Sequence, residues 1–280
     1  MLVNSKKILT KAKEEKFAIP SANFIDLNSA RTYVAVSNEK NLPLFLSFAQ
    51  SHKDLISLEE AALIGKYLGR RAKSPIILHL DHGEDYEFIK KAIDLGFTSV
   101  MIDASQEQFE DNVAITKAVV EYAHSKNVTV EAELGHVGAN ENFEAHEVVD
   151  SIYTEVSDVI KFVESTNIDS LAVSIGTAHG AYKGEPKINF ERLTEINEVT
   201  DIPLVLHGGS SSGDNNLERC SLNGIAKINI FTDFLNEAYN SIFENKPKNY
   251  LELKEFADES MYDVLSHYYK VFHTKSMKLI

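Results

Sequence analysis

Apolar and polar positions alternate along the chain in blocks. Eight mostly apolar runs have the length of β-strands, and a stretch with helical spacing follows each of them. The runs lie at Phe17–Phe24, Leu42–Ala49, Pro75–His82, Ser99–Ser105, Val128–Gly135, Ser170–Gly180, Pro203–Ser210 and Ile225–Thr232. Runs that stay apolar throughout are typical of parallel strands covered on both faces.

The stretches between these runs carry helix start signals. Ser57-Leu58-Glu59-Glu60 fits a capping box, with a hydroxyl at the N-cap and a glutamate three residues on, and predicts a helix to about Lys73. Further helices are predicted at Leu27–Lys40, Tyr86–Leu95, Gln106–Lys126, Thr154–Ser165, Phe190–Val199, Asn215–Leu222 and Asp233–Glu244. Eight strands, each followed by a helix, predict a (β/α)8 TIM barrel.

A doubly wound open sheet is the alternative α/β fold. Such a sheet usually has a glycine-rich turn after its first strand, and the first turn here, Ser21-Ala22-Asn23-Phe24, has none. We therefore favour the barrel and expect residues 1–280 to form a single domain. Residues 247–280 lie outside the eightfold count, and Tyr250–Tyr269 has helical spacing. This segment predicts extra C-terminal helices that pack on the barrel or on a neighbouring subunit.

Charge and composition narrow the choice of partners. The formal net charge is −14, which argues against nucleic acid and anionic membrane surfaces, because both bind a positive face. Anionic small molecules stay open, since they need only a local cluster of donors. The single cysteine, Cys220, rules out an intrachain disulfide. The chain has no signal-peptide core and no apolar run of about 18 residues, so we expect a cytoplasmic protein.

Polar groups gather at the carboxyl ends of the predicted strands, where TIM barrels place their chemistry. His82, His179 and His207 end the third, sixth and seventh runs. A single histidine at a strand end is usually structural, but three converging imidazoles with one open position form a catalytic divalent-metal site, most often for zinc. Asp103 and Glu133 end the fourth and fifth runs. They are candidates for metal ligands, a second site, partners that orient the imidazoles, or salt bridges to a loop lysine.

A second cluster suits a phosphate group. Gly208–Gly213 follows the seventh run and Asn229–Thr232 ends the eighth, and TIM barrels commonly bind phosphate at these positions. Gly180 allows another close approach of the backbone. Asp81 supplies a carboxyl group, and His79 is assigned to the core or to the surroundings of the site. A metal beside a phosphate ester suits aldol or isomerase chemistry and also metal-assisted hydrolysis.

Five longer segments carry a specific resemblance. They are Leu78–Gly83, Ser99–Asp103, Val130–Gly135, Ser170–Pro186 and Pro203–Ser210. They strongly resemble the class II, metal-dependent ketose-bisphosphate aldolases, the family that includes the fructose- and tagatose-bisphosphate enzymes. The likeness extends from about residue 17 to residue 235.

The resemblance implies roles for the residues singled out above. The three histidines hold zinc, with the two carboxylates as alternative or second-site ligands and with a second divalent or a monovalent cation as a further option. Asp81 exchanges a proton with the hydroxyl at the broken bond, and Glu141 acts as a base on the side of the dihydroxyacetone phosphate enediolate. The substrate pocket is formed by Asn23, Gly180, Gly208, Gly209, Ser210, Asn229, Ile230, Phe231 and Thr232. A homodimer or homotetramer is also implied.

The chain departs from the family pattern at the edge of this site. Ala49 stands where a serine is expected, Phe231 where a small or acidic residue is expected, and Asp103–Gln106 replaces the usual Asp-Gly-Ser-His. Many members carry an arginine for the distal phosphate in their C-terminal helices, whereas the last arginine here is Arg219. We therefore expect an intact metal centre and an altered aldehyde end.

The expected function is a zinc-dependent aldolase that cleaves or forms a ketose 1,6-bisphosphate. The alternatives are an aldolase for a different ketose derived from dihydroxyacetone phosphate, a metal-dependent hydrolase on the same barrel, and a non-catalytic relative that binds a sugar phosphate. Such hydrolases more often show His-x-His on the first strand, and Ile19-Pro20-Ser21 has no such pair.

Overall fold

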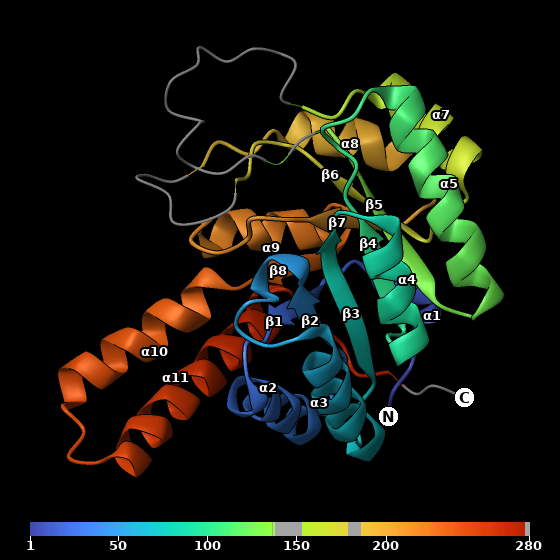
Figure 1. Ribbon diagram of the computed structural model, residues 1–280. Helices are drawn as coiled ribbons and strands as arrows, with labels where there is room; N and C mark the ends of the chain where they lie inside the picture. Colours follow the sequence, from blue (N-terminus) through green and yellow to red (C-terminus); the bar gives the residue numbers. More distant parts are fainter. Residues whose placement is uncertain (136, 138–152, 179–185, 278–280) are drawn as a thin grey trace.

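Eight parallel strands form a closed barrel in chain order in a computed structural model of the protein (Figure 1). The structure describes residues 1–135, 137, 153–178 and 186–277. The strands are β1 (Ile19–Asn23), β2 (Leu44–Ala49), β3 (Ile76–Gly83), β4 (Ser99–Ile102), β5 (Thr129–Leu134), β6 (Ser170–Val173), β7 (Leu204–Leu206) and β8 (Ile225–Ile230). Because β8 pairs with β1, the sheet has no free edge. The predicted (β/α)8 barrel is confirmed.

Helices surround the barrel. The helices α2 (Leu27–Lys40), α4 (Tyr86–Leu95) and α8 (Phe190–Val199) have the predicted bounds. The capping box of α3 is also present, since Ser57 Oγ accepts from Glu60 N at 3.2 Å. The other helices are α3 (Leu58–Arg71), α5 (Phe109–Ser125), α7 (Val156–Thr166), α9 (Asp214–Leu222), α10 (Thr232–Asn245) and α11 (Tyr250–Val271), with a short 3-10 helix, η1 (Gln50–His52), after β2.

One helix, α1 (Lys6–Glu14), was not predicted. Its buried face, Ile8, Leu9 and Ala12, packs with residues near the amino-terminal ends of the strands, including Phe45 of β2 and Ile77 of β3. The helix thus contributes to an apolar cluster at the amino-terminal end of the barrel. The polar groups of the barrel interior lie further along the strands, toward the opposite end.

Several predicted strands are too long. The fourth run ends as a strand at Ile102 rather than Ser105, and the sixth ends at Val173 rather than Gly180. Ile175 and Ala178 remain buried after β6 has ended. An apolar run therefore marks burial here, and it does not separate a strand from the buried loop that follows it.

The C-terminal helices α10 and α11 form a hairpin that projects from one side of the barrel (Figure 1). The root of the hairpin packs on the barrel helices, where the rings of Tyr33 and Phe234 lie 4.6 Å apart. The chain then returns to the barrel, and Ala18 N donates to Phe272 O at 3.0 Å. Among the helices that the structure describes, none is long and apolar enough to cross a membrane.

Candidate active site

The end of β3 is bent so that adjacent residues serve one site. On a regular strand Asp81 and His82 would point to opposite faces, so both can serve one site only if the backbone turns here, which the sequence permits at Gly83. The structure places the turn at His82, whose φ is +46°, and the register with β4 shifts between Leu80 and Gly83. Such bulges commonly re-aim side chains beside active sites. Gly83 allows close packing instead, since a Cβ there would lie 2.5 Å from Met101 O.

Two of the predicted histidines meet at the barrel mouth. His82 Nε2 lies 2.8 Å from His207 Nδ1. Burial lowers the pKa of His82, but the charge of Asp81 and the hydrogen bond to Asp103 outweigh it and raise the pKa to about 9. The raised pKa favours the imidazolium form of His82, in which Nε2–H can donate to His207 Nδ1. A metal ion that binds these two nitrogens would replace this proton.

Among the residues that the structure describes, the donor atoms form two groups that share His82. The ligand atoms of Asp81, His82 and His207 lie within 4.8 Å of one another, and so do those of His82, Asp103 and Glu133. Imidazole nitrogens combined with carboxylate oxygens fit a divalent ion such as zinc. Asp81, predicted only as a proton carrier, thus lies among the candidate ligands.

Asp81 is held on both sides by amides. Asn23 Nδ2 donates to one carboxylate oxygen at 2.8 Å and Asn229 Nδ2 donates to the other at 2.9 Å. Burial acts to raise the pKa of Asp81, but the charge of the adjacent His82 outweighs it and holds the pKa well below the usual range. The carboxylate is ionised and fixed in direction, and each oxygen keeps a second lone pair for a ligand.

The two other predicted carboxylates have different environments. Asp103 Oδ2 lies 2.8 Å from His82 Nδ1, and Asp103 Oδ1 accepts from Ser105 Oγ at 2.7 Å. Glu133 Oε1 accepts from Val137 N at 3.0 Å, while its buried Oε2 has no hydrogen-bond partner in the described part of the chain. Burial, together with the charge of Asp103, raises the pKa of Glu133 to about 8. A buried carboxyl oxygen without a partner fits a group that binds a cation.

The loops after β7 and β8 are tied together where a phosphate was predicted. Gly208 has a φ of +67°, and a Cβ there would lie 2.3 Å from Ala178 O, so only glycine fits without a shift of the backbone. Ser210 Oγ accepts from Phe231 N at 3.0 Å and from Asp233 N at 3.4 Å. These bonds join the glycine loop to the start of α10.

The remaining predicted pocket residues differ in what they offer. Gly209 N donates to Asn229 O at 3.1 Å. The side chain of Ile230 is fully buried in the apolar core, which leaves its backbone for any ligand contact. Thr232, predicted as a strand end, is the first residue of α10. Three other predicted site residues lie outside the described part of the chain: Glu141, His179 and Gly180.

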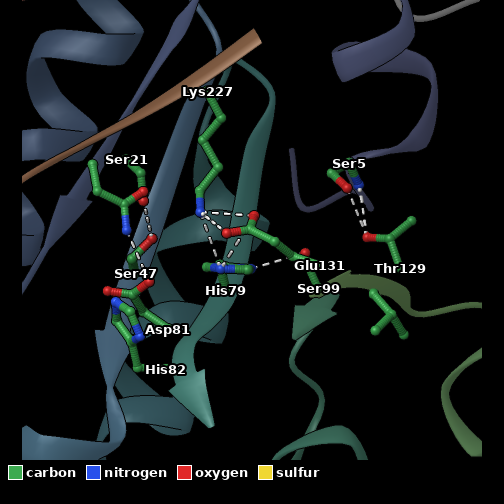
Figure 2. Close-up of polar contacts among 12 residues, drawn as sticks. Ser5, Ser21, Ser47, His79, Asp81, His82, Ser99, Thr129, Glu131 and Lys227 are labelled. Carbon is green, nitrogen blue, oxygen red and sulfur yellow. Dashed lines mark hydrogen bonds and ion pairs between the residues drawn. The ribbon is translucent and has the colours of Figure 1, made fainter. Parts of the chain in front are cut away.

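The sequence interpretation missed two charged residues beneath the site. Glu131 on β5 and Lys227 on β8 are fully buried, and Lys227 Nζ donates to both carboxylate oxygens of Glu131 at 2.8 and 2.9 Å (Figure 2). Each stands two residues before a predicted site residue, Glu133 or Asn229, and therefore faces the same side of its strand. The sequence signal for both residues was a charged side chain inside an apolar run, two positions from a predicted site residue.

A third missed residue lies at the rim. His52, at the end of η1, has its ring centroid 4.6 Å from that of Phe231. Its buried Nδ1 has no hydrogen-bond partner among residues 1–135, 137, 153–178 and 186–277. Burial lowers the pKa of His52, and the charge of Asp81 opposes this effect. His52 therefore packs against the altered Phe231 position, and the charge of the carboxylate expected to move a proton reaches it.

The comparison with known families decides the family of the chain. A family model described as "Fructose-bisphosphate aldolase class-II" matches residues 3–277. The chain belongs to this family. It is therefore an aldolase, a carbon–carbon lyase of a metal-dependent family that acts on sugar phosphates.

Individual relatives agree with this assignment. The aldolase is 41% identical over 235 residues to the fructose-bisphosphate aldolases of Staphylococcus aureus and Staphylococcus epidermidis, covering 83% of this chain and 82% of theirs. Its fold is similar to that of the YdjI aldolase from Escherichia coli K12, with a TM-score of 0.88, 31% identity and 97% of each chain covered. A putative fructose-1,6-bisphosphate aldolase from Coccidioides immitis gives a TM-score of 0.85, 28% identity and 95% coverage of each chain.

Proposed function

We propose that this aldolase is zinc-dependent and that it cleaves or forms a ketose 1,6-bisphosphate, of the fructose or tagatose type, through dihydroxyacetone phosphate. One observation carries the proposal. His82 Nε2 and His207 Nδ1 face each other at 2.8 Å, and the ligand atoms of Asp81 lie in the same group. Two imidazole nitrogens beside an oriented carboxylate provide a metal site and a proton carrier in one place.

The zinc would be held by His82 and His207, with His179 as the third ligand that the resemblance implies. Asp103 and Glu133 are the candidates for a further position. The bound ion supplies a Lewis acid that stabilises the negative charge left on dihydroxyacetone phosphate when the carbon–carbon bond breaks. The residues of this chain perform the remaining tasks of binding, orientation and proton transfer.

Asp81 would move the proton at the bond that breaks. In cleavage it accepts the proton of the substrate hydroxyl, and in condensation it returns that proton to the new hydroxyl. Its amide partners, Asn23 and Asn229, keep the carboxylate ionised and aimed while a lone pair stays open to substrate. Glu141 keeps its proposed role as the base on the dihydroxyacetone phosphate side.

The phosphate of dihydroxyacetone phosphate would bind to the loops after β7 and β8. Gly208 and Gly209 bring bare backbone close to the site, where a side chain would collide with neighbouring atoms. The hydrogen bonds of Ser210 to the first turn of α10 keep the two loops together. A cradle that is already assembled lowers the entropy lost when the phosphate binds.

A second candidate is an aldolase for a different ketose derived from dihydroxyacetone phosphate. Arg219, the last arginine in the sequence, is exposed on α9, and its guanidinium stacks 3.6 Å from the ring centroid of Phe190. It is therefore already engaged on the outer surface. The His52–Phe231 pair at the rim also favours an aldehyde other than glyceraldehyde 3-phosphate, because it adds bulk and a nitrogen that has no partner among the described residues.

The test is a panel of aldehydes, each incubated with dihydroxyacetone phosphate with and without zinc. We expect zinc-dependent condensation, with glyceraldehyde 3-phosphate as the best acceptor under the first candidate and with an unphosphorylated hydroxyaldehyde under the second. Product formation is followed by chromatography and mass spectrometry. If no aldehyde condenses and no ketose phosphate is cleaved, both candidates are wrong.

A further inference from the structure

Four ionisable side chains form a buried layer beneath the mouth of the barrel. They are His79 on β3, Glu131 on β5, Lys227 on β8 and His207 after β7, and all are fully buried. Figure 2 shows the ammonium group of Lys227 directed at Glu131 and His79. The family assignment and the predicted metal site account for His207 but leave the other three without a role.

The donors and acceptors of this layer can be assigned from Lys227, which can only donate. Lys227 Nζ has three protons and no acceptor; it donates to both oxygens of Glu131 and lies 3.3 Å from His79 Nε2. Because His79 Nε2 must accept, its other nitrogen carries the proton, and that Nδ1 lies 2.9 Å from Ser99 Oγ. His79 is thereby used within the layer and is not a metal ligand.

The same logic fixes the protonation of His207. Glu131 Oε1 lies 2.9 Å from His207 Nε2, and a carboxylate paired with an ammonium can only accept. His207 therefore carries its proton on Nε2 and offers a lone pair on Nδ1. The donor group Asn229 Nδ2 lies 3.5 Å from that Nδ1, on the side that faces His82. Two neighbours thus agree that His207 Nδ1 is an acceptor.

We propose that Glu131, held in place by Lys227, is a positioning residue that fixes His207 in its Nε2–H tautomer and thereby presents Nδ1 to the divalent ion. Lys227 is needed because an ionised carboxylate buried alone is very costly. Lys227 donates its hydrogen bonds to Glu131, which in turn contacts His207. The proposal rests on the proposed function only in that His207 is taken to bind the ion.

The first measurement uses the wild-type protein without metal. In protein labelled with ¹⁵N-histidine, long-range nitrogen–carbon-proton spectra distinguish the two tautomers, and a His207→Gln variant assigns the signals. We expect His207 Nε2 to be protonated and Nδ1 to be an acceptor. A proton on Nδ1 of His207, with a bare Nε2, overturns the proposal whatever the variants do.

The second measurement compares metal affinities of the full chain. Glu131→Gln can turn either its oxygen or its NH2 group toward His207, so we expect mixed tautomers and a zinc affinity about 10- to 100-fold lower, as for other partners of metal-binding histidines. Affinity is measured by competition with a fluorescent chelator. Wild-type affinity together with the wild-type tautomer in this variant overturns the proposal.

Two further variants separate positioning from stability. Glu131→Leu combined with Lys227→Met removes both charges, and apolar replacement of a buried pair is often neutral for folding. We expect it to keep its cooperative unfolding and to lose zinc affinity as Glu131→Gln does. Ser21→Ala removes the 2.7 Å contact with Ser47 in the same layer but touches no histidine, and we expect zinc affinity within twofold of wild type.

These readouts are independent of turnover. If the wild-type protein shows the Nε2–H tautomer and binds zinc through His207 but condenses no aldehyde, the proposed function fails and the positioning role stands. If the enzyme is active while Glu131→Gln leaves tautomer and affinity unchanged, the positioning role fails alone.

Discussion

The buried layer of His79, Glu131, Lys227 and His207, here called the floor, and the mouth of the barrel differ in how their polar groups are hydrogen-bonded. In the floor, Lys227, Glu131 and His79 are joined by hydrogen bonds at 2.8 to 3.3 Å. Around the mouth, five buried polar atoms have no hydrogen-bond partner among the residues that the structure describes: Asn23 Oδ1, His52 Nδ1, Glu133 Oε2, Thr177 Oγ1 and Asn229 Oδ1. Burying a polar atom without a hydrogen bond costs about 1–3 kcal/mol, so native proteins rarely contain such an atom unless it has a functional role. The floor is complete by itself, and the mouth is arranged for a ligand.

The proposed metal ligands and the rim residues also differ in how closely they follow the family pattern. The proposed metal-binding residues that the structure describes lie at or near strand ends. Phe231, where the chain departs from the expected residue, immediately precedes α10, and His52 of η1 packs against it. We therefore expect the chemistry to follow from the strands and the choice of aldehyde to follow from the rim.

The largest expected effect comes from removing the metal. A Lewis acid contributes several kcal/mol to the stabilisation of charge, so treatment with a chelator should lower the cleavage rate by about a thousandfold or more. Added zinc should restore it. Because the floor is satisfied without metal, circular dichroism should show that the metal-free barrel stays folded. Full activity after exhaustive chelation would contradict the metal-dependent mechanism.

The next effect concerns the proton carrier. Asp81→Ala should lower kcat by a factor on the order of 100 or more while zinc stays bound, because the two histidines still face each other. Asp81→Asn is the matched control: it keeps the size and one acceptor oxygen but cannot take the proton, and should be about equally slow. Metal content and kcat are measured on the same samples. Unchanged turnover in either variant would exclude this role.

A smaller effect is expected at the rim. If His52 Nδ1 binds a substrate hydroxyl, His52→Phe keeps the ring contact with Phe231 and removes one hydrogen bond worth about 1 kcal/mol. The preference for glycolaldehyde over acetaldehyde, measured as a ratio of kcat/KM values, should fall roughly fivefold. Exchange of the C3 proton of dihydroxyacetone phosphate without aldehyde should not change. An unaltered preference would remove His52 from the aldehyde site.

The smallest effect lies outside both regions. Ser57→Ala removes the cap of α3, in which Ser57 Oγ accepts from Glu60 N, and should lower the free energy of unfolding by about 1 kcal/mol. Turnover and zinc affinity should stay at wild-type values. Urea denaturation followed by circular dichroism provides the measurement. A loss of activity in the folded variant would mean that the rim depends on α3, contrary to the separation drawn here.

The barrel could be predicted because its pattern is repeated eight times. Periodicity and caps located α2, α4 and α8 to the residue. The amino-terminal helix α1 was missed because its four lysines mask a short buried stripe of Ile8, Leu9 and Ala12. Apolarity alone also overextended β4 and β6, since the loops that follow are partly buried.

The site was predictable where function and strand ends coincide. His82, Asp103, Glu133 and His207 were found because polar groups ending apolar runs are conspicuous, and the structure brings them together. The floor was missed because the partners of Glu131 lie far away in the chain: Lys227 is 96 residues from it. Only the closed barrel brings a lysine of β8 next to a glutamate of β5, and only the φ of +46° at His82 shows how two adjacent residues share a site.

The central claim is that one divalent ion binds between two imidazoles at the barrel mouth. Anomalous diffraction at the zinc edge, from crystals of the full chain grown with zinc, tests it most directly. The account predicts a peak about 2.0–2.1 Å from both His82 Nε2 and His207 Nδ1. A zinc peak bound elsewhere, or His207 bound through Nε2, would contradict it.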